Sequence, residues 1–399
     1  MKTRVKTAKE KKPRFLILGA KEYPLGANKG EDAFSSGGYE TYTQQLAPLL
    51  ARRGARVIVL TRKFASQPAR ETAEGVEIVR VGWLRGFLLR NPSFNANALR
   101  EAVFMPRGTF NIILANGVIA TLAGIKTKFL RRLGGERVRV IARPAGVAWV
   151  QPQYGAAVKT ALRFLETLAY KLADAVVFLS EGEREQFRKK LGFLPRRHAV
   201  IHTGVDARRF QAVDEAKARR KVRTQLALDK NSRLIVFVGR LMRVKGLEFL
   251  VKAMPRVDAV LLIVGDGPLR AELEKLAQEA GAREKVFFAK SGDVAETLKA
   301  ADAFALPSLS EGLPLALLEA MAARRACVVT DIGLPVRDKV DALVVPPADS
   351  AALAGALNEV LGDAALRTRL GENAFERAKK DFNWNGAVNA YFKLAEKLV

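Results

Sequence analysis

Side chains that cross-link a chain or bind metal ions are scarce in this sequence. Its 399 residues include one cysteine, Cys327, and two histidines, His198 and His202. A single cysteine excludes an internal disulfide, and its place in the apolar run 326–329 predicts a buried side chain in a protein of a reducing compartment. The two histidines lack the partners of a zinc site, so we interpret both as local structure.

Long apolar runs are absent too. No stretch reaches the roughly 20 residues that a membrane-spanning helix requires. Residues 1–13 are basic but contain no apolar segment of the kind found in a secretory signal peptide. We therefore predict a basic, disordered tail at residues 1–13 of a cytoplasmic protein that is neither exported nor membrane-spanning.

Acidic residues are few relative to basic ones. The chain has 67 Lys and Arg against 41 Asp and Glu, a net charge of +26, and residues 1–210 hold 38 of the basic and 16 of the acidic residues. An excess of positive charge attracts nucleic acid, an anionic membrane surface or an anionic substrate. A general bias toward basic residues would produce the same excess. The basic residues are not interleaved with stacking aromatics, so nucleic acid is not the expected partner.

Short apolar runs recur along the chain and alternate with helical or irregular stretches. A chain of this length is expected to fold into two domains. The alternation of apolar runs with helical stretches favours an α/β fold with doubly wound parallel sheets. We place the domains at residues 14–203 and 204–383, followed by a C-terminal helix at 384–399 that could pack on either. Strands are expected at residues 14–18, 56–60, 76–81, 111–115, 138–142, 175–179, 233–238, 259–264, 285–288, 303–306, 326–330 and 343–345.

Apolar residues at helical spacing predict helices in the first domain. One opens near Ser35 and ends before Gly54, and Pro48 should kink or shorten it. A second covers residues 121–133. A third covers residues 155–172 and carries one apolar stripe from Val158 to Leu172.

Two glutamates stand eight positions apart across an expected loop-to-helix junction. Glu311 follows the apolar run 303–306, and Glu319 falls in the second turn of a helix whose first position suits Pro314. Open α/β sheets bind ligands at the carboxyl ends of their strands, so both carboxylates could face one crevice. An arbitrary pair of glutamates is more often part of a solvated surface.

Two further strand ends carry residues suited to a phosphate group. Residues 238–246 read V-G-R-L-M-R-V-K-G, in which Gly239 permits close backbone approach, and Arg240 and Lys245 can reach one point above the strand. Residues 264–268 read V-G-D-G-P, a tight turn before a helix, whose amides favour an anion or a ribose hydroxyl. Each motif alone also occurs in ordinary loops.

Taken together and in order, these residues resemble the retaining GT-B glycosyltransferases of family four, which use a nucleotide sugar. The resemblance covers nearly all of residues 15–392 and is strongest from 234 to 329. The matching motifs are Gly37 and Gly38 before a helix, the strand end at Ser180, Gly204-Val205-Asp206, the pair Arg240 and Lys245, the turn Gly265-Asp266-Gly267-Pro268, and Glu311 with Glu319.

The resemblance implies a GT-B architecture of two Rossmann-like domains facing a central cleft, with the acceptor domain first and the donor domain second. Glu311 would lie by the donor hexose, and Glu319 would hold the ribose hydroxyls. Arg240 and Lys245 would neutralise the departing diphosphate, aided by amides near Gly38, in place of a divalent metal. Leaving and attacking oxygens would share one face of an oxocarbenium-like centre. No metal or other cofactor is implied.

The same resemblance implies the remaining site positions. Backbone groups of residues 289–292 would read the base, and Arg143 and Ser180 would lie on the acceptor side. Arg143 stands where the family often has a histidine, and a guanidinium can donate to a phosphate but cannot accept a proton at neutral pH. The donor-binding residues, besides those already assigned, are Gly37, Gly38, Gly239, Gly265, Asp266, Gly267, Ser291, Leu313, Pro314 and Leu315.

Two segments of the first half suit an anionic lipid surface. Residues 83–90 mix large apolar residues with arginines, and the helix 121–133 carries a basic cluster. Burial of Trp83 and its apolar neighbours in the core is an equally good interpretation. The cluster consists of Lys126, Lys128, Arg131 and Arg132.

We therefore expect a hexosyltransferase that acts on a lipid-linked, glycan or phosphate-bearing acceptor in cell-envelope glycan or glycolipid synthesis, peripheral to the inner face of the plasma membrane. One alternative is a GT-B sugar-nucleotide epimerase, which the absence of its histidine and the presence of E-x7-E disfavour. Another is a non-enzymatic protein that binds polyanions. A dinucleotide-dependent oxidoreductase would need G-x-G-x-x-G after the first strand, and residues 19–21 do not supply it.

Overall fold

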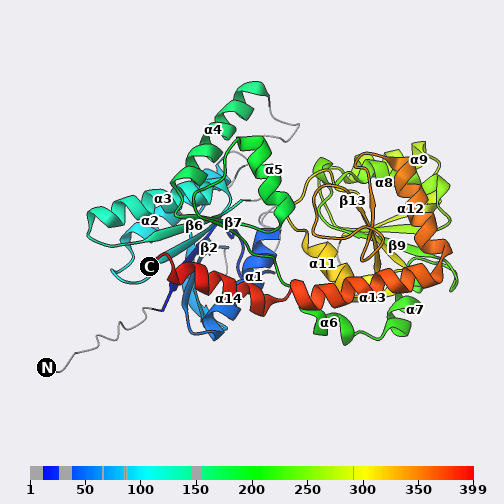
Figure 1. The fold of residues 1–399 in the computed structure, drawn as a ribbon, viewed down its shortest axis with the longest axis horizontal. Helices are drawn as coiled ribbons and strands as arrows, with labels where there is room; N and C mark the ends of the chain where they lie inside the picture. The colour runs from blue at the N-terminus through cyan, green and yellow to red at the C-terminus, as the bar shows by residue number, and fades with distance from the viewer. Residues whose placement is uncertain are drawn as a thin grey trace. The chain divides into compact units, whose positions relative to one another are not determined.

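The computed structural model describes residues 12–26, 38–64, 67–84, 86, 89–144, 155–290 and 292–399. The chain divides into two compact units, which Figure 1 shows as ribbons. Unit 1 takes the described residues up to Val177, together with Phe193–Ile201 and Val388–Val399. Unit 2 takes Phe178–Gly192 and His202–Ala387. The prediction of an α/β fold with two doubly wound sheets is confirmed.

Unit 1 is built on an eight-stranded sheet of order β3-β4-β2-β1-β5-β6-β7-β8. Strand β3 pairs antiparallel with β4, and the pairs from β4 across to β7 are parallel. The central strands are continuous apolar runs because helices cover both faces of such a sheet. The strands are β1 (Arg14–Leu18), β2 (Arg56–Arg62), β3 (Arg70–Ala73), β4 (Val76–Val81), β5 (Ile112–Asn116), β6 (Arg139–Arg143), β7 (Ala175–Phe178) and β8 (His198–Val200).

The first helix of unit 1 corrects a prediction. Pro48 was expected to kink or shorten it, but the helix continues past Pro48 to Arg52, so the shortening is wrong and a kink stays a prediction. Buried Leu46, Ala47 and Leu50 lie on either side of the proline, and their packing offsets the one missing backbone hydrogen bond. The helices are α1 (Gly38–Arg52), α2 (Arg90–Phe104), α3 (Val118–Leu133) and α4 (Ala156–Leu172).

Unit 2 is built on a six-stranded sheet of order β11-β10-β9-β12-β13-β14, all of it parallel. This is the doubly wound order, in which the chain reverses direction across the sheet beside β9. Cys327 in β13 is fully buried, as predicted. The strands are β9 (Leu234–Val238), β10 (Val260–Val264), β11 (Val286–Ala289), β12 (Ala303–Leu306), β13 (Ala326–Thr330) and β14 (Leu343–Val345).

Helices surround the second sheet, and the last helix of the chain begins in unit 2 and ends in unit 1. In unit 1 the Tyr42 hydroxyl donates to that of Tyr391 at 2.7 Å, and the Phe392 ring packs on Phe15. No helix in the described part of the chain is long and apolar enough to cross a membrane. The helices are α5 (Glu181–Leu191), α6 (Ala207–Gln211), α7 (Glu215–Gln225), α8 (Leu247–Ala253), α9 (Arg270–Glu279), α10 (Val294–Ala300), α11 (Leu315–Ala322), α12 (Ser350–Gly362), α13 (Ala364–Asp381) and α14 (Trp384–Glu396).

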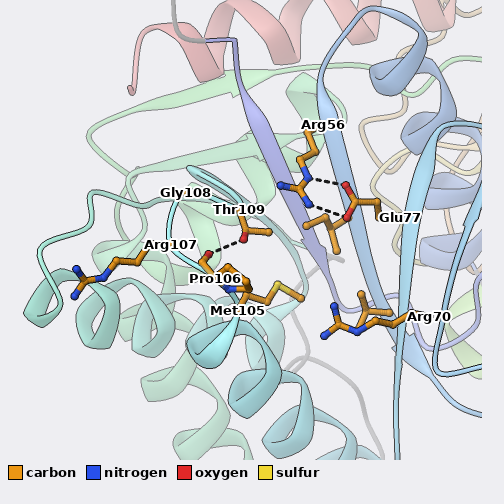
Figure 2. A pocket seen from close by; sticks show the side chains of 10 residues that line it. Arg56, Arg70, Glu77, Met105, Pro106, Arg107, Gly108 and Thr109 are labelled. Carbon is orange, nitrogen blue, oxygen red and sulfur yellow. Dashed lines mark hydrogen bonds and ion pairs between the residues drawn. The ribbon is translucent and has the colours of Figure 1, made fainter.

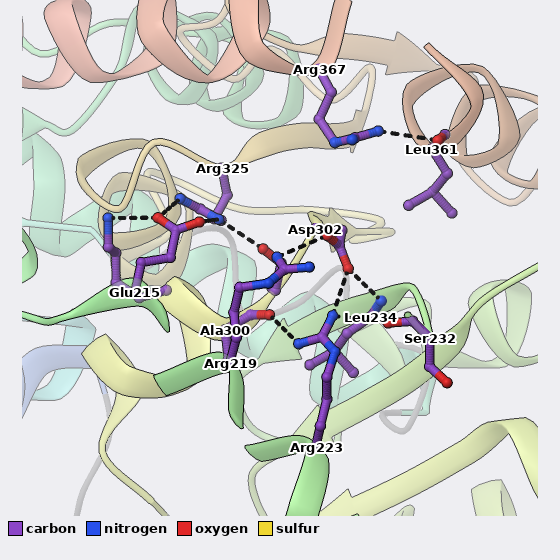
Figure 3. A network of polar contacts seen from close by, with 12 residues as sticks. Glu215, Arg219, Arg223, Ser232, Leu234, Ala300, Asp302, Arg325, Leu361 and Arg367 are labelled. Atoms are coloured by element: carbon purple, nitrogen blue, oxygen red, sulfur yellow. Dashed lines mark hydrogen bonds and ion pairs between the residues drawn. The ribbon is translucent and has the colours of Figure 1, made fainter. Parts of the chain in front are cut away.

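A buried ion-pair network stabilises the amino-terminal ends of β9 and β12 (Figure 3). The Asp302 carboxylate accepts from Arg219 at 2.9 Å, from Arg223 at 3.0 Å and from the Leu234 amide at 2.8 Å. The Arg223 side chain is 5% exposed and also donates to two backbone carbonyls. A buried charge without its partner is costly, so Asp302 holds this end of the sheet together.

We predict that Asp302→Ala destabilises unit 2 by about 3 kcal/mol, because it leaves the Arg223 guanidinium buried without a counter-ion. Asp258→Ala is the matched control, since its carboxylate is 97% exposed and lies 3.8 Å from Arg233. The control should change stability by no more than about 0.5 kcal/mol. Urea unfolding of the three proteins measures both effects, and equal midpoints for the two variants would contradict this account.

Candidate functional site

Three loops of unit 2 meet at one edge of its sheet. They follow β9 (residues 239–246), β10 (265–269) and β12 (307–314). Because β9, β10 and β12 are neighbours in a parallel sheet, their carboxyl ends lie side by side. The predicted phosphate motifs and Glu311 are therefore brought together on adjacent loops.

Glycines allow these loops to touch. A Cβ on Gly265 would lie 1.9 Å from the Gly239 carbonyl oxygen, and one on Gly267 would lie 2.5 Å from the Leu241 carbonyl oxygen. Gly246 has a φ of +60° and faces the Pro307 carbonyl oxygen, which a Cβ would meet at 2.2 Å. No larger residue fits these positions without moving the backbone.

Backbone hydrogen bonds hold the loops at these contacts. The Gly239 amide donates to Val264 at 2.9 Å, and the Leu241 amide donates to Asp266 at 3.0 Å. The Leu309 amide donates to the Val244 carbonyl at 2.8 Å, which links the loop after β12 to the 3-10 turn Arg243–Lys245. The three loops thus form one connected platform.

An ion pair lies at the centre of this platform. The Lys245 ammonium contacts Oε1 of Glu311, and the Ser308 hydroxyl donates to the same oxygen at 3.0 Å. The two charged side chains are 19% and 14% exposed. Arg240, on the same loop as Lys245, is half-buried. Partial burial strengthens the attraction between the two charges and fixes their direction.

Glu319 lies in the second turn of α11, the helix that follows the Glu311 loop. Burial raises the pKa of its carboxyl to about 7, and the Arg209 guanidinium of α6 opposes part of that rise. Pro314 precedes the helix in an extended conformation instead of occupying its predicted first position. Leu313 is buried beside it, and Leu315 begins the helix.

Two family profiles match the chain. "Glycosyl transferases group 1" matches residues 218–377, which include all three loops, and "Glycosyl transferase 4-like domain" matches residues 37–204. The chain belongs to the group 1 glycosyltransferases. It is a glycosyltransferase of the GT-B fold that uses nucleotide sugars.

Known proteins resemble this glycosyltransferase over nearly its whole length. The D-inositol 3-phosphate glycosyltransferase of Xylanimonas cellulosilytica is 29% identical, and the match covers 95% of each chain. Sucrose-phosphate synthase from Thermosynechococcus elongatus has a similar structure, with a TM-score of 0.78, 25% identity, and coverage of 97% of this chain and 99% of that one. HepE of Anabaena, solved in complex with UDP-glucose, gives a TM-score of 0.76 at 19% identity, with 97% and 100% covered.

The other predicted site residues of the glycosyltransferase are divided between the two units. Gly37 and Ser291 fall outside the described residues. Gly38 begins α1 in unit 1, and Arg143 ends β6 in the same unit. The Arg143 guanidinium lies 3.6 Å from the centre of the Tyr42 ring and donates to Asn116 Oδ1 at 3.4 Å. Ser180 precedes α5 and belongs to unit 2.

The sequence did not identify two side chains near the site, Glu183 and Gln186 of α5. Glu183 is buried, and its Oε2 accepts from the Leu179 amide at 2.6 Å. The Gln186 amide donates to the Ile332 carbonyl at 2.6 Å. The pattern S-E-G-E at 180–183 is a helix-capping signal that could have pointed to the first of them.

The basic cluster predicted for the helix 121–133 is only partly at the surface. Lys126 and Arg132 are exposed. Arg131 is buried and donates to four backbone carbonyls, and Lys128 pairs with Asp174 at 2.7 Å. The prediction of four surface cations is therefore wrong for Arg131, because the turn after α2 needs donors for its carbonyls.

The two histidines make local contacts, as predicted. His198 Nδ1 lies 2.9 Å from the Pro195 carbonyl oxygen, and His202 Nδ1 lies 2.7 Å from that of Leu179. Within the described ranges, no group of three His, Cys, Asp or Glu side chains is arranged to hold a metal ion.

A separate hollow of about 220 Å³ lies in unit 1, next to the first residues of β2 and β4 (Figure 2). Arg56 there forms a two-point ion pair with Glu77 at 2.6 and 2.9 Å, and Arg70 pairs with Glu101. Figure 2 shows Arg107 turned away from the hollow. Because two of its arginines are already paired with glutamates, we assign it no function.

We predict that one glutamate carboxyl titrates near pH 7, since burial raises the pKa of Glu319 to about 7. Carbon-13 NMR of protein labelled at glutamate carboxyls measures this pH dependence. Glu319→Gln should remove that titration and leave the others in place. If every glutamate carboxyl finishes titrating below about pH 5.5, near the ordinary range for this side chain, Glu319 is not buried as described.

Proposed function

We propose that this enzyme transfers a hexose from a nucleoside diphosphate sugar to a lipid-linked, glycan or phosphate-bearing acceptor, with retention of anomeric configuration and without a metal ion. Unit 2 binds the donor and unit 1 binds the acceptor. The observation that carries the donor site is the Lys245–Glu311 ion pair at the meeting point of the three loops. It combines a cation for a diphosphate with a carboxylate for sugar hydroxyls.

Donor binding exchanges the partners of this ion pair. A diphosphate would replace Glu311 as the partner of Lys245, with Arg240 on the same loop as the second cation. The Glu311 carboxylate would then accept hydrogen bonds from hexose hydroxyls while Ser308 still holds Oε1. In this proposal the two cations lie beside the oxygen where negative charge develops, so they stabilise the departing diphosphate.

Glu319 holds the ribose in this proposal. An ionised carboxylate accepts two hydrogen bonds from neighbouring hydroxyls, whereas the protonated form also carries a donor. Since its pKa is raised to about 7, donor affinity should increase as the pH rises through that value. The base lies against backbone groups at the end of β11, near residues 289–292.

Retention follows from the geometry of attack. The departing diphosphate oxygen and the attacking hydroxyl share one face of an oxocarbenium-like centre, so no carboxylate nucleophile is needed. Glu311 orients the hexose in this scheme and does not form a covalent bond to it. In this scheme the leaving diphosphate oxygen takes the proton of the attacking hydroxyl.

The surroundings of the Arg143 side chain support the proposal that the acceptor is anionic. Its side chain is buried, it stacks on Tyr42, and its Nε–H has no hydrogen-bond acceptor among the described residues. A guanidinium held in this way suits a phosphate. The relative from Xylanimonas cellulosilytica is named for a phosphorylated acceptor, D-inositol 3-phosphate. We propose that Arg143 binds the acceptor phosphate.

An exposed apolar face on α3 and α4 supports a membrane-bound acceptor. Phe129 and Leu133 of α3 are 61% and 72% exposed, and Phe164 of α4 is 66% exposed. The apolar stripe predicted for residues 155–172 is thus largely at the surface. The exposed cations Lys126 and Arg132 lie on α3 beside it. Apolar side chains with flanking cations suit the headgroup region of an anionic bilayer.

Trp83 is not part of this face. It is half-buried, its ring packs on Phe64, and its indole N–H donates to the Lys63 carbonyl at 3.0 Å. Residues 85, 87 and 88 of the predicted lipid-binding segment lie outside the described residues. We therefore propose α3 and α4, in place of residues 83–90, as the surface that rests on the inner face of the plasma membrane during cell-envelope glycan or glycolipid synthesis.

We predict that Arg240→Gln and Lys245→Gln each lower the turnover of donor by about 100-fold, because each removes a cation from the developing charge. The assay follows slow hydrolysis of UDP-, GDP- and ADP-sugars by nucleotide release. Lys252→Gln is the control, since this lysine is exposed on α8. Equal turnover in wild type and all three variants would remove the donor site from unit 2.

We also predict that the protein sediments with vesicles containing phosphatidylglycerol and that salt weakens this binding. The double variant Phe129→Glu with Leu133→Glu should lose most of the bound fraction. Val340→Glu, at a comparably apolar and 40% exposed position of unit 2, should not. Binding that ignores both lipid charge and the double substitution argues against the α3 and α4 surface.

A further inference from the structure

Helix α5 belongs to unit 2 although both neighbouring strands are in the sheet of unit 1. The chain passes from β7 into unit 2 at Phe178 and returns to unit 1 at Phe193, before β8. These 15 residues include Ser180 and Glu183, which contact the loop after β12, and Gly182 and Gln186, which contact the loop after β13.

Ser180 joins the start of α5 to the residue that follows Glu311. Its hydroxyl accepts from the Glu183 amide at 3.0 Å, which caps the helix, and donates to the Gly312 carbonyl at 2.9 Å. The Ser180 residue is fully buried. One hydroxyl therefore satisfies a helix end and fixes the peptide beside Glu311.

The Glu183 carboxylate packs against Gly312, the residue whose carbonyl accepts from Ser180. A Cβ on Gly312 would lie 2.8 Å from Oε1 of Glu183, so only glycine leaves room for this carboxylate. The other oxygen of Glu183 accepts from the Leu179 amide at 2.6 Å, which prevents the side chain from moving aside. Gly312 is thus held between Ser180 and Glu183.

A second loop is attached to the same helix. A Cβ on Gly182 would lie 1.8 Å from the Gly333 carbonyl oxygen, and Gln186 donates to Ile332 at 2.6 Å. Ile332 and Gly333 follow β13, the neighbour of β12. The first two turns of α5 therefore rest on the loops after both strands, and such close backbone contact leaves little freedom to shift.

We propose that the first turn of α5 is a positioning device for Glu311. Ser180 and Glu183 fix the Gly312 peptide, and Ser308 holds Oε1 of Glu311, so that the carboxylate points at the hexose once Lys245 has moved to the diphosphate. This rests on the proposed function and gives Ser180 a positioning role in the donor site, in place of the acceptor role that the sequence suggested. Ser180 touches no reacting atom and acts through Glu311.

A loss of this positioning has a kinetic signature. Because misplacing a reacting or orienting group by about 1 Å costs up to 100-fold in rate, Ser180→Ala should lower kcat for donor hydrolysis by about 10- to 100-fold. The KM for the donor should stay within about twofold, since Lys245 and Glu319 still bind the diphosphate and ribose. Ser180→Thr retains the hydroxyl and should restore kcat.

Asp214→Ala is the matched control for the lost helix cap. Asp214 caps α7 by accepting from the Lys217 amide at 3.0 Å, and within the described part of the chain it forms no hydrogen bond or ion pair with the three loops. It should lower thermal stability as much as Ser180→Ala does, with kcat unchanged. Equal kcat values in these two variants would show that Ser180 is only a cap.

A double-mutant cycle with Glu311→Gln tests the positioning role of Ser180 separately from the proposed function of the enzyme. If Ser180 acts through Glu311, Ser180→Ala should have no further effect on kcat in the Glu311→Gln background. Full additivity of the two losses would overturn the positioning role while leaving the proposed function intact. Unchanged turnover in Glu311→Gln itself would overturn the proposed function.

Discussion

Close backbone contact between neighbouring loops is the constraint on which the proposed donor site depends. Gly265 lies against Gly239, and Gly246 lies against Pro307, at separations that no Cβ could share. These contacts bring the loops after β9, β10 and β12 into one platform at the carboxyl edge of the sheet. Lys245 and Glu311 come from different loops, so their meeting is a direct result of this packing.

The platform also explains the electrostatics of the site. Lys245 and Glu311 are partly buried and pair with each other. Glu319, in the helix that follows the Glu311 loop, is half-buried, and burial raises its pKa while Arg209 opposes that rise. Partly buried charges lower the free energy of unfolding of unit 2, and burial of its apolar core offsets this loss. What is gained is a set of charges whose directions are set before the substrate arrives.

Much of the fold and part of the site could be predicted from the sequence. The strands β1, β4, β12, β13 and β14 have the expected bounds, because each is a short apolar run between helices or turns. Strands β3 and β8 lie at the two edges of their sheet, and they were missed because R-E-T-A is largely polar and H-A-V is only three residues long. Spacing made Glu311, Glu319, Arg240 and Lys245 candidates, and the family resemblance supplied the roles that we propose for them. Spacing could not show that Ser180 bonds to Gly312, a contact between residues 132 positions apart that exists only in the folded unit.

The most direct test of the account is a crystal structure of the protein soaked in turn with UDP, GDP and ADP. We predict that the diphosphate of whichever nucleotide binds lies within hydrogen-bonding distance of Lys245 and Arg240, with its ribose hydroxyls on Glu319. Lys245 should then have left Glu311, its partner in this structure. Well-ordered diphosphate density away from the three loops, with the Lys245–Glu311 pair intact, would contradict the central claim.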